Sequence, residues 1–488
     1  MSAVVIGGCL PTPPSVNSDE FWTYVGGNTG NLLFMYAASQ IVGLPTVTLP
    51  PGVDLNRDPI ASEAVETALV VIKPSANLLR PACVYENSSE LQACTRWSRD
   101  LADLLVRGRV PLLLTSLGLE ANPLTCELHV EQLDLLAALH GNCGLIPLRG
   151  EDTACLLRRH AVEGGVVLGC PSFTVPKAGI AALAARNERT EVAVCLPPHF
   201  QGFAAEHCTL ATTLRRLVQE AGAPVLAQTQ EDVAVAASWG GRALLFSNVD
   251  DWCAELKNYG AVLSGRIHGS VAALMAAVPC ITFCTSTRVR ELSDVLALPA
   301  WDVTDPRLES LCSPDNLLNL ARSVWADAAP RIDAKRATLA QRWCVELARL
   351  CLPPSHHLQS VADSAPPPVA RDHHHHLLLP PSPLTAFGVR ARHLRIRRLR
   401  NQLPQGFLCA DYALCNPDLL SDDIEALSEH FLQSGQKEGR PWRLAALPCD
   451  FTPNVYRLLN PDLANLNDDQ CAVHYRAHGK REGRLWQH

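Results

Sequence analysis

The residues best suited to chemistry lie in the run Ser-Gly-Arg-Ile-His-Gly at positions 264–269. An apolar run, 261–263, precedes it and a helix-like run, 270–277, follows it, so the pattern predicts a strand, a turn and a helix. Ligands of open α/β sheets bind beyond the carboxyl ends of the strands, and a helix N-terminus attracts anions. Arg266 offers a planar guanidinium and His268 a proton donor or acceptor near neutral pH. We therefore expect both to act on an anionic ligand.

Two glycines flank this pair. Gly265 and Gly269 have no side chain, which lets the backbone approach a bound group closely. The alternative is a structural one, in which Arg266, His268 and the upstream Arg149 only brace an interface between two domains.

Residues 1–352 alternate between short apolar runs and helix-like segments. The apolar runs are Leu69–Ile72, Val110–Thr115, Gly144–Leu148, Val192–Leu196, Ala243–Phe246, Ala261–Leu263 and Cys280–Phe283. The helix-like segments are Ser89–Val106, Val130–His140, Asp152–His160, Cys208–Glu220, Asp251–Lys257, Ser270–Ala277 and Arg331–Leu350. Such alternation predicts an α/β fold with parallel sheets covered on both faces. We expect two Rossmann-like domains, 1–180 and 181–352, with the last helix closing the second.

Residues 353–403 differ in composition from the rest. Prolines are frequent up to position 383, so we expect an extended linker. The four histidines 373–376 suggest either a site for a soft divalent metal or, as we favour, a solvated low-complexity tract. Arginines interleave with apolar residues over Arg390–Arg400, which suggests either an ordinary solvated face or a peripheral contact with an anionic membrane surface or glycan.

Residues 404–488 contain an internal repeat. The same residues recur 44 positions apart without a gap: Tyr412 and Tyr456, Asn-Pro-Asp-Leu at 416–419 and 460–463, His430 and His474, Gly435 and Gly479, Glu-Gly-Arg at 438–440 and 482–484, and Trp442 and Trp486. Each unit is too small to bury much surface alone, so we expect the two to pack together as one helical module.

The overall composition excludes several classes of protein. The chain has 488 residues and a net charge of -7, without the concentrated basic surface of a nucleic-acid binder. No apolar run approaches the roughly 18 residues of a membrane span, and the start lacks the pattern of a signal peptide. The 19 cysteines are scattered with no C-x-x-C pair, so we expect reduced, mostly buried thiols and a cytoplasmic location.

Several common motifs are absent. The sequence has no P-loop, no Gly-x-Gly-x-x-Gly after its first strand, no Gly-x-Ser-x-Gly elbow and no Asp-x-Asp at a strand end. We therefore predict neither a bound cofactor nor a catalytic metal.

Further motifs accompany the run at 264–269 in a fixed order. They are Gly-Gly-Asn-Thr-Gly-Asn at 26–31, Arg-Gly-Glu-Asp-Thr at 149–153, Gly-Cys-Pro-Ser at 169–172, Val-Pro at 278–279, and then Arg288 and Glu291. This set resembles the polysaccharide pyruvyl transferase family over about residues 20–300. The tail is similar to the short repeats with Asn-Pro-Asp-Leu and Glu-Gly-Arg that are appended to glycan-building enzymes.

The resemblance implies a two-domain fold similar to GT-B glycosyltransferases. It also implies transfer of pyruvate from phosphoenolpyruvate to two hydroxyls of a sugar, which forms a ketal and releases phosphate. On this basis Arg266 and His268 are the catalytic residues. The substrate-binding residues implied are Arg149, Gly265, Gly269, Gly30, Asn31, Arg288 and Glu291. Two arginines facing each other across a cleft suit a donor that carries both a carboxylate and a phosphate.

The sequence departs from the family pattern at two positions. Ser286 and Gly260 stand where an aspartate is common, which predicts altered acceptor choice or weak activity. Two other functions remain open: a nucleotide-sugar glycosyltransferase of GT-B type, and a non-catalytic glycan-binding or assembly protein that works through its repeats.

Overall fold

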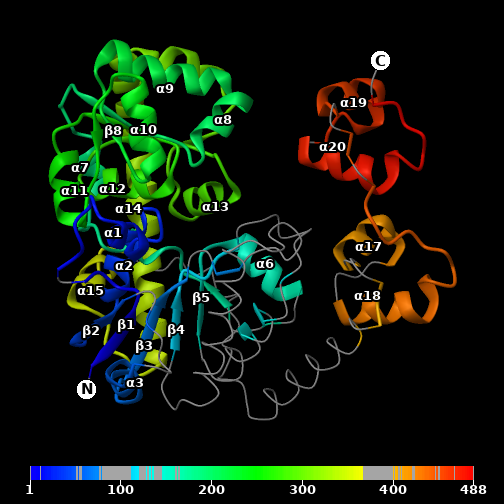
Figure 1. The fold of residues 1–488 in the computed structure, drawn as a ribbon, viewed down its shortest axis with the longest axis horizontal. Helices are drawn as coiled ribbons and strands as arrows, with labels where there is room; N and C mark the ends of the chain where they lie inside the picture. Colours follow the sequence, from blue (N-terminus) through cyan, green and yellow to red (C-terminus); the bar gives the residue numbers. More distant parts are fainter. Residues whose placement is uncertain are drawn as a thin grey trace.

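Figure 1 shows the chain as a computed structural model. The structure describes residues 2–50 except Pro11, 53, 58–75, 78–79, 112–119, 128, 131–132, 135–136, 145–159, 162, 165–365, 399, 402–404, 407, 409–419, 424–445, 447–448, 451–466 and 468–486. The expected helices Ser89–Val106 and, for the most part, Val130–His140 lie outside these residues. So do the histidine run 373–376 and nearly all of Arg390–Arg400.

The first half of the fold is built on a parallel sheet with the strand order β2-β1-β3-β4. Its strands are β1 (Ala3–Ile6), β2 (Thr46–Leu49), β3 (Val70–Pro74) and β4 (Leu112–Thr115). A parallel pair, β5 (Ile146–Leu148) and β6 (Gly165–Val167), adjoins β4 through the bridge between Leu117 and Leu148. The described helices here are α1 (Asp19–Tyr24), α2 (Asn31–Ser39), α3 (Pro59–Glu66) and α6 (Glu151–Arg159).

The second half is a six-stranded parallel sheet with the order β12-β11-β10-β7-β8-β9. Its strands are β7 (Val192–Cys195), β8 (Val225–Leu226), β9 (Ala243–Leu244), β10 (Ala261–Ser264), β11 (Cys280–Phe283) and β12 (Ala300–Trp301). Its helices are α7 (Ile180–Ala184), α8 (Phe200–Glu206), α9 (Cys208–Ala221), α10 (Gln230–Ser238), α11 (Val249–Leu256), α12 (Ile267–Met275) and α13 (Thr287–Leu296). Every residue of β7, β10 and β11 is buried, as the uninterrupted apolar runs predict for central parallel strands.

One long helix joins the two halves. Helix α14 (Pro314–Arg349) begins against the second sheet, where the indole of Trp325 donates to the carbonyl of Cys280. Its carboxyl-terminal part lies on the first half, where the indole of Trp343 donates to the carbonyl of Leu168. The expectation that this helix closes only the second half was therefore wrong, because its apolar residues cover cores on both sides of Pro330.

The chain then returns to the first half instead of entering a linker at residue 353. Helix α15 (His356–Ala362) buries Leu358 and Val361 in the same core as β1 and β3. The backbone from Pro353 to Ser355 exchanges hydrogen bonds with residues 41–43, and Val42 forms a bridge with Pro354. Residues 353–362 therefore belong to the first half, and the prediction that a linker begins at residue 353 was wrong.

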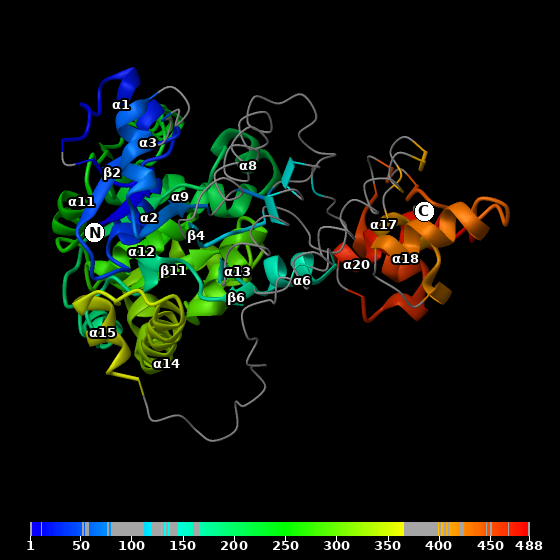
Figure 2. The ribbon, with the colours of Figure 1, turned by 90° about the horizontal axis from the view of Figure 1, so that it is seen from below.

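The two sequence repeats adopt the same local structure. The first contains α17 (Cys409–Cys415), a 3-10 turn at Pro417–Leu419, α18 (Ile424–His430) and a π-helical turn at Phe431–Gly435. The second contains α19 (Pro453–Leu459), Pro461–Leu463, α20 (Asp468–His474) and Tyr475–Gly479 in the same order. Figures 1 and 2 show them as a pair beside the body of the molecule.

The repeated residues hold each unit together and the two units contact each other. The hydroxyl of Tyr412 lies 2.9 Å from Nδ1 of His430, and Tyr456 and His474 repeat this contact at 3.0 Å. Between the units, the backbone of Ala445 exchanges hydrogen bonds with Arg476. These motif residues therefore serve the fold of the module first.

The alternation of strands and helices predicted the mixed α/β class and the parallel sheets correctly. The runs that we expected to be strands all contain one. The pattern missed β1, β2, β6, β8 and β12. β6, β8 and β12 have only two or three residues and β2 lies at the edge of its sheet, whereas β1 is a central strand of four buried residues. None of the helices in the described part of the chain is long and apolar enough to cross a membrane.

Candidate active site

A pocket lies at the carboxyl ends of the strands in the second half. Ten residues line it: Asn28, Pro198, Gln228, Gly265, Arg266, Ile267, His268, Ser286, Arg288 and Val289. Its empty volume is about 330 Å³ when the open mouth is included. No aspartate or glutamate is among these described lining residues.

Two helix N-termini face this pocket. Helix α12 begins at Ile267 with Arg266 as its N-cap, and no side chain of the described residues caps it. Helix α13 begins at Thr287 behind Ser286, whose hydroxyl accepts from the amide of Val289 at 3.4 Å. Because amide groups and partial positive charge collect at such ends, the pocket favours an anion.

The two glycines of the motif have different surroundings. Gly265 lines the pocket, and a side chain there would press on the backbone of Pro197. Gly269 lies behind the pocket, where a Cβ would come within 2.6 Å of the Ser264 hydroxyl and 2.9 Å of the Cys195 thiol. At Gly269 the missing side chain therefore lets α12 pack against the sheet, whatever the ligand.

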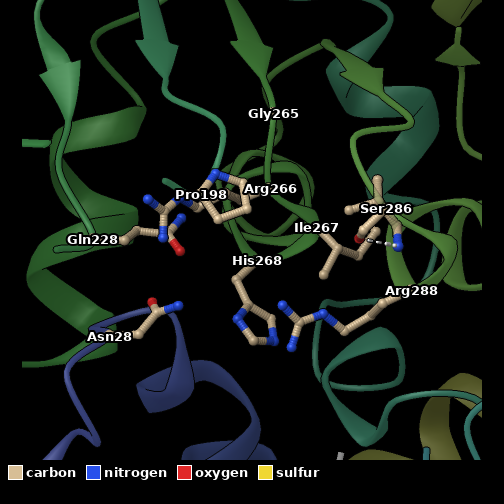
Figure 3. Close-up of a pocket in the computed structure, with 10 residues that line it drawn as sticks. Asn28, Pro198, Gln228, Gly265, Arg266, Ile267, His268, Ser286 and Arg288 are labelled. Carbon is tan, nitrogen blue, oxygen red and sulfur yellow. Dashed lines mark hydrogen bonds between the residues drawn. The ribbon is translucent and has the colours of Figure 1, made fainter. Parts of the chain in front are cut away.

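His268 stands at the centre of the pocket (Figure 3). Its ring lies 5.5 Å from that of Phe34 on α2, and the guanidinium of Arg288 lies beside it. Burial is the main cause that lowers the pKa of His268 to about 3, and Arg288, Arg266 and Arg149 lower it further. The imidazole is thus neutral at neutral pH and can accept a proton or donate one hydrogen bond.

Arg266 is held by groups of the protein itself. Its Nε donates to the carbonyl of Leu196 at 2.8 Å, and its Nη2 donates to Oδ1 of Asp232 at 2.9 Å. Asp232 is fully buried and also accepts from the amides of Gln228 and Thr229 through Oδ2. Arg266 therefore enters the pocket as one half of a buried ion pair, with its position fixed in advance.

Gln228 contributes an amide at the pocket wall. It is fully buried, its Nε2 donates to the thiol of Cys195 at 3.2 Å, and its Oε1 has no hydrogen-bond partner among the described residues. Figure 3 shows this side chain facing the space between Arg266 and Asn28. An N–H or O–H group of a bound ligand would satisfy Oε1, so we count Gln228 among the residues that could contact a ligand.

The glycine-asparagine loop of the first half reaches this pocket. The amide of Thr29 donates to the carbonyl of Gln228 at 2.9 Å, which places Asn28 on the pocket wall. A Cβ at Gly30 would collide with Oε1 of Gln228 and lie within 2.7 Å of Nδ1 of His268. Asn31 points away from the pocket and donates to the carbonyl of Val25 at 2.9 Å.

Arg149 and Glu291 meet away from the pocket wall and link the two halves. Nε of the fully buried Arg149 donates to Oε2 of Glu291 at 2.7 Å, and Nη2 donates to the carbonyl of Leu119. The amide and hydroxyl of Thr153 donate to Oε1 of the same carboxylate at 3.1 and 3.2 Å. Two residues of the Arg-Gly-Glu-Asp-Thr motif in the first half, Arg149 and Thr153, therefore bind Glu291 on α13 of the second half.

The two positions that depart from the family pattern have clear local roles. Ser286 caps α13 and lines the pocket. At Gly260 a Cβ would collide with the carbonyl of Arg189, so this backbone leaves no room for a carboxylate.

The structure thus brings five of the expected residues to the pocket or against it: Arg266, His268, Gly265, Arg288 and Gly30. The sequence prediction missed Asn28, Gln228 and Asp232. Asn28 lies within a motif that was noticed, whereas Asp232 was detectable only as part of a Thr-x-x-Asp capping box. The described residues hold no group of three or more His, Cys, Asp and Glu side chains suited to a metal ion.

Comparisons with known proteins give one match to a family and several distant structural likenesses. No curated protein matches the chain. The co-structure of S. aureus MnaA with UDP is 12% identical, with a TM-score of 0.36 over 73% of this chain and 99% of that chain. The wall teichoic acid polymerase TagF soaked with CDPG is 9% identical, with a TM-score of 0.36 over 72% and 89%. The model of the polysaccharide pyruvyl transferase family matches residues 125–286, about a third of the chain and the part that carries Arg149, Gln228, Arg266 and His268.

Proposed function

We propose that this protein is a polysaccharide pyruvyl transferase that takes its pyruvate from phosphoenolpyruvate. The observation that carries the proposal is the pocket itself. It combines two helix N-termini, two arginines and a neutral histidine, and its described lining includes no carboxylate. Such a pocket suits a small ligand with two anionic groups, and the family match covers its central residues.

The roles of the pocket residues follow from their positions. Arg288 and the N-terminus of α13 would hold one anionic group, and Arg266 with the N-terminus of α12 the other. The amide NH₂ of Asn28 would donate to phosphoenolpyruvate, and Oε1 of Gln228 would accept a hydrogen bond from a sugar hydroxyl. Bound negative charge would raise the low pKa of His268 and make it a stronger base, which suits the removal of a hydroxyl proton.

The reaction balances without a cofactor. The methylene carbon of phosphoenolpyruvate takes one proton and becomes a methyl group, and one sugar hydroxyl forms a bond to the neighbouring carbon. The bond from that carbon to the phosphate oxygen breaks, and a second hydroxyl takes its place to complete the ketal. The two hydroxyl protons end on the methyl group and on the released phosphate. In this scheme His268 accepts a hydroxyl proton, and Arg266 stabilises the leaving phosphate.

Three further parts complete the proposal. The two parallel sheets, and the loop by which the first half reaches the pocket of the second, support a GT-B-like arrangement of the halves. The acceptor would be a cell-envelope glycan or its precursor, made in the cytoplasm. The Arg390–Arg400 segment would bring the enzyme to an anionic membrane surface.

The test is phosphate release from phosphoenolpyruvate on addition of candidate sugars. We expect release that depends on the sugar, and a product whose mass exceeds that of the sugar by one pyruvate ketal. Release of free nucleotide from a nucleotide sugar, with phosphoenolpyruvate untouched, would favour a glycosyltransferase and contradict the proposal.

A further inference from the structure

The two repeat units of the tail stack in one direction, so different sides of the two units meet. Helix α17 of the first unit packs against the π-helical turn Tyr475–Gly479 of the second unit. Nη2 of Arg481, just beyond that turn, donates to the carbonyl of Cys415 at the end of α17 at 3.3 Å. Arg476, within the turn, lies near enough to Asp411 on α17 to oppose the rise in its pKa that burial causes. The α17 side of the first unit therefore binds the turn side of the second.

The 44-residue spacing of the repeats gives each side a counterpart in the other unit. The counterpart of the α17 side lies on α19 of the second unit, and that of the turn side lies at Phe431–Gly435 of the first. Stacked repeats bury their contact faces against neighbouring repeats. The two counterparts are therefore the surfaces on which a further unit would stack.

The counterpart of the α17 side is an apolar patch on the second unit. We call it the α19 face, and it consists of Val455, Leu458, Leu459 and Leu485. Leu458 is 70% exposed and Leu485 is 64% exposed. Nδ2 of Asn460 donates to the carbonyl of Leu485 at 2.8 Å, which keeps this residue at the end of α19. Two large apolar side chains that are so exposed on one small module indicate a surface for a protein contact.

The same positions of the first unit are less exposed. Leu414 matches Leu458 and is partly buried, and Cys415 matches Leu459 and is only 5% exposed. Both lie on α17, the helix that the second unit contacts. The patch is thus covered where a second unit follows and open on the second unit itself.

The counterpart of the turn side is also open. We call it the turn face, and it consists of Leu432, Gln433 and Lys437 of the first unit. Ala477 lies in the turn of the second unit and is 1% exposed, whereas its counterpart Gln433 is exposed. Lys437 is exposed and matches Arg481, so it offers another cation that can donate to a carbonyl.

The residues of the two open faces differ from the inner contact in a matched way. Inside the module Asp411 of one unit lies near Arg476 of the other. At these positions the open faces hold Val455 and Leu432 instead. An opposite-charge pair is replaced by an apolar pair, so the two open faces complement each other as the inner faces do.

We propose that a second copy of this chain docks the turn face of its first unit on the α19 face, in the arrangement that the two units of one copy have. The second copy's Leu432 would lie on Val455, and its Lys437 would donate to the carbonyl of Leu459. Each copy offers both faces, so this head-to-tail contact continues beyond a dimer. The proposal does not depend on the proposed function.

Sedimentation velocity of the full-length protein tests the self-association. The contact is small and belongs to the weak class, so the average mass should at least double between about 1 and 300 µM. Leu458→Asp and, independently, Leu485→Asp place a charge in the apolar patch and should keep the protein monomeric. Ile60→Asp is the matched control, because Ile60 is 78% exposed on α3 of the first half. It should assemble as the wild type does.

Mixing two variants identifies the two faces. Gln433→Glu combined with Lys437→Glu charges the turn face, and both residues are exposed, so the fold should be kept. This double variant should be monomeric alone, and its melting temperature and that of Leu458→Asp should equal that of the wild type. Each of the two proteins retains one intact face. Their mixture should therefore form a dimer of one copy of each and nothing larger.

Three results would overturn the inference. The first is a wild type that stays monomeric at about 300 µM. The second is assembly that Leu458→Asp prevents but the charged turn face does not, because the α19 face would then bind itself. The third is a monomeric wild type that floats with phosphatidylcholine vesicles while Leu458→Asp does not, which would assign the face to a membrane surface.

Discussion

His268 shows how strongly the surroundings change the chemistry of one side chain. In water its imidazole would titrate near neutral pH, but burial and three nearby arginines lower its pKa to about 3. The ligand-free site therefore holds a neutral ring. An anionic ligand would reverse part of this shift, so that proton transfer and ligand binding are coupled at one residue.

The first prediction concerns this residue. His268→Ala should lower turnover at least about a hundredfold, the usual contribution of a general acid or base. Melting temperature at neutral pH should change little, because the ring lines the pocket and makes no hydrogen bond to the described residues. Steady-state phosphate release and thermal unfolding check the two parts, and near-normal turnover would remove His268 from the mechanism.

The second prediction follows from the direction of the pKa shift. Between pH 6.5 and about 3 the unfolded chain binds a proton at His268 that the folded chain does not. Stability should therefore fall as pH falls through this window, by about 1.4 kcal/mol per pH unit from this group. Urea unfolding at pH 7, 5 and 4 measures the loss, which should be smaller in His268→Asn. Equal losses in both proteins would contradict the assigned environment.

At the scale of the elements, an ion pair between α10 and the start of α12 fixes the position of Arg266 in the pocket. Asp232 caps α10 through its backbone contacts and pairs with Arg266 at the start of α12. Asp232→Asn keeps the shape of the side chain but removes its charge. We expect weaker binding of phosphoenolpyruvate with a smaller effect on kcat, since the variant frees Arg266 to move. Arg266→Lys should act in the same direction, because lysine lacks the planar fork.

A control separates positioning from general damage to the fold. Thr229→Ala removes the other half of the capping box, whose hydroxyl accepts from the amide of Asp232 at 3.2 Å. It should lower stability by about 1 kcal/mol and leave donor affinity nearly intact. If Asp232→Asn and Thr229→Ala weakened phosphoenolpyruvate binding equally, the binding would depend on the helix cap of α10 and not on the ion pair with Arg266.

The loop at residues 26–31 supports a fourth prediction. A methyl group at Gly30 would press on His268 and Gln228, so Gly30→Ala should lower activity by more than tenfold. Gly27→Ala is a useful comparison. It lies in the same loop, a Cβ there would meet no atom of the described residues within 4 Å, and its φ of 73° confines its cost to backbone strain. Comparable activity in the two variants would show that the close approach at Gly30 is unimportant.

The elements were predictable where the apolar pattern is strong. Strands β10 and β11 and the helix start between them follow from local sequence, and so does the placement of Arg266 and His268. The partners of Arg149 and Arg266 were not predictable, because Glu291 and Asp232 lie far from them in the sequence and pairing depends on how the halves assemble. The same reason explains why Arg149 and Glu291 were both expected to contact substrate, whereas they bind each other.

For the protein as a whole, the return of the chain to the first half changes where the catalytic body ends. A truncated chain that ends near Leu352 would lose α15 and expose the core around Leu358 and Val361. We expect it to aggregate or to melt well below the full chain, as thermal unfolding and light scattering would show. One that ends at Ala365 should fold and process a small soluble acceptor normally.

The tail itself is expected to act on large acceptors. If the module at 404–488 tethers a glycan near the cleft, the chain that ends at Ala365 should be slower on a polymeric acceptor only. Loss of activity on the small acceptor would show that the module is part of the catalytic body.

The path of α14 and α15 also has a consequence for synthesis. The first half contains β1 from the start of the chain and α15 from residues 356–362, so its core closes only after the whole second half has been made. At roughly 5–20 residues per second, the ribosome needs on the order of 10–40 s to travel from β6 to α15. During that time Ala3, Val5 and Ile72 lack part of their cover. The nascent first half therefore offers chaperones an exposed apolar surface, and a ribosomal pause between β6 and α15 would lengthen its exposure.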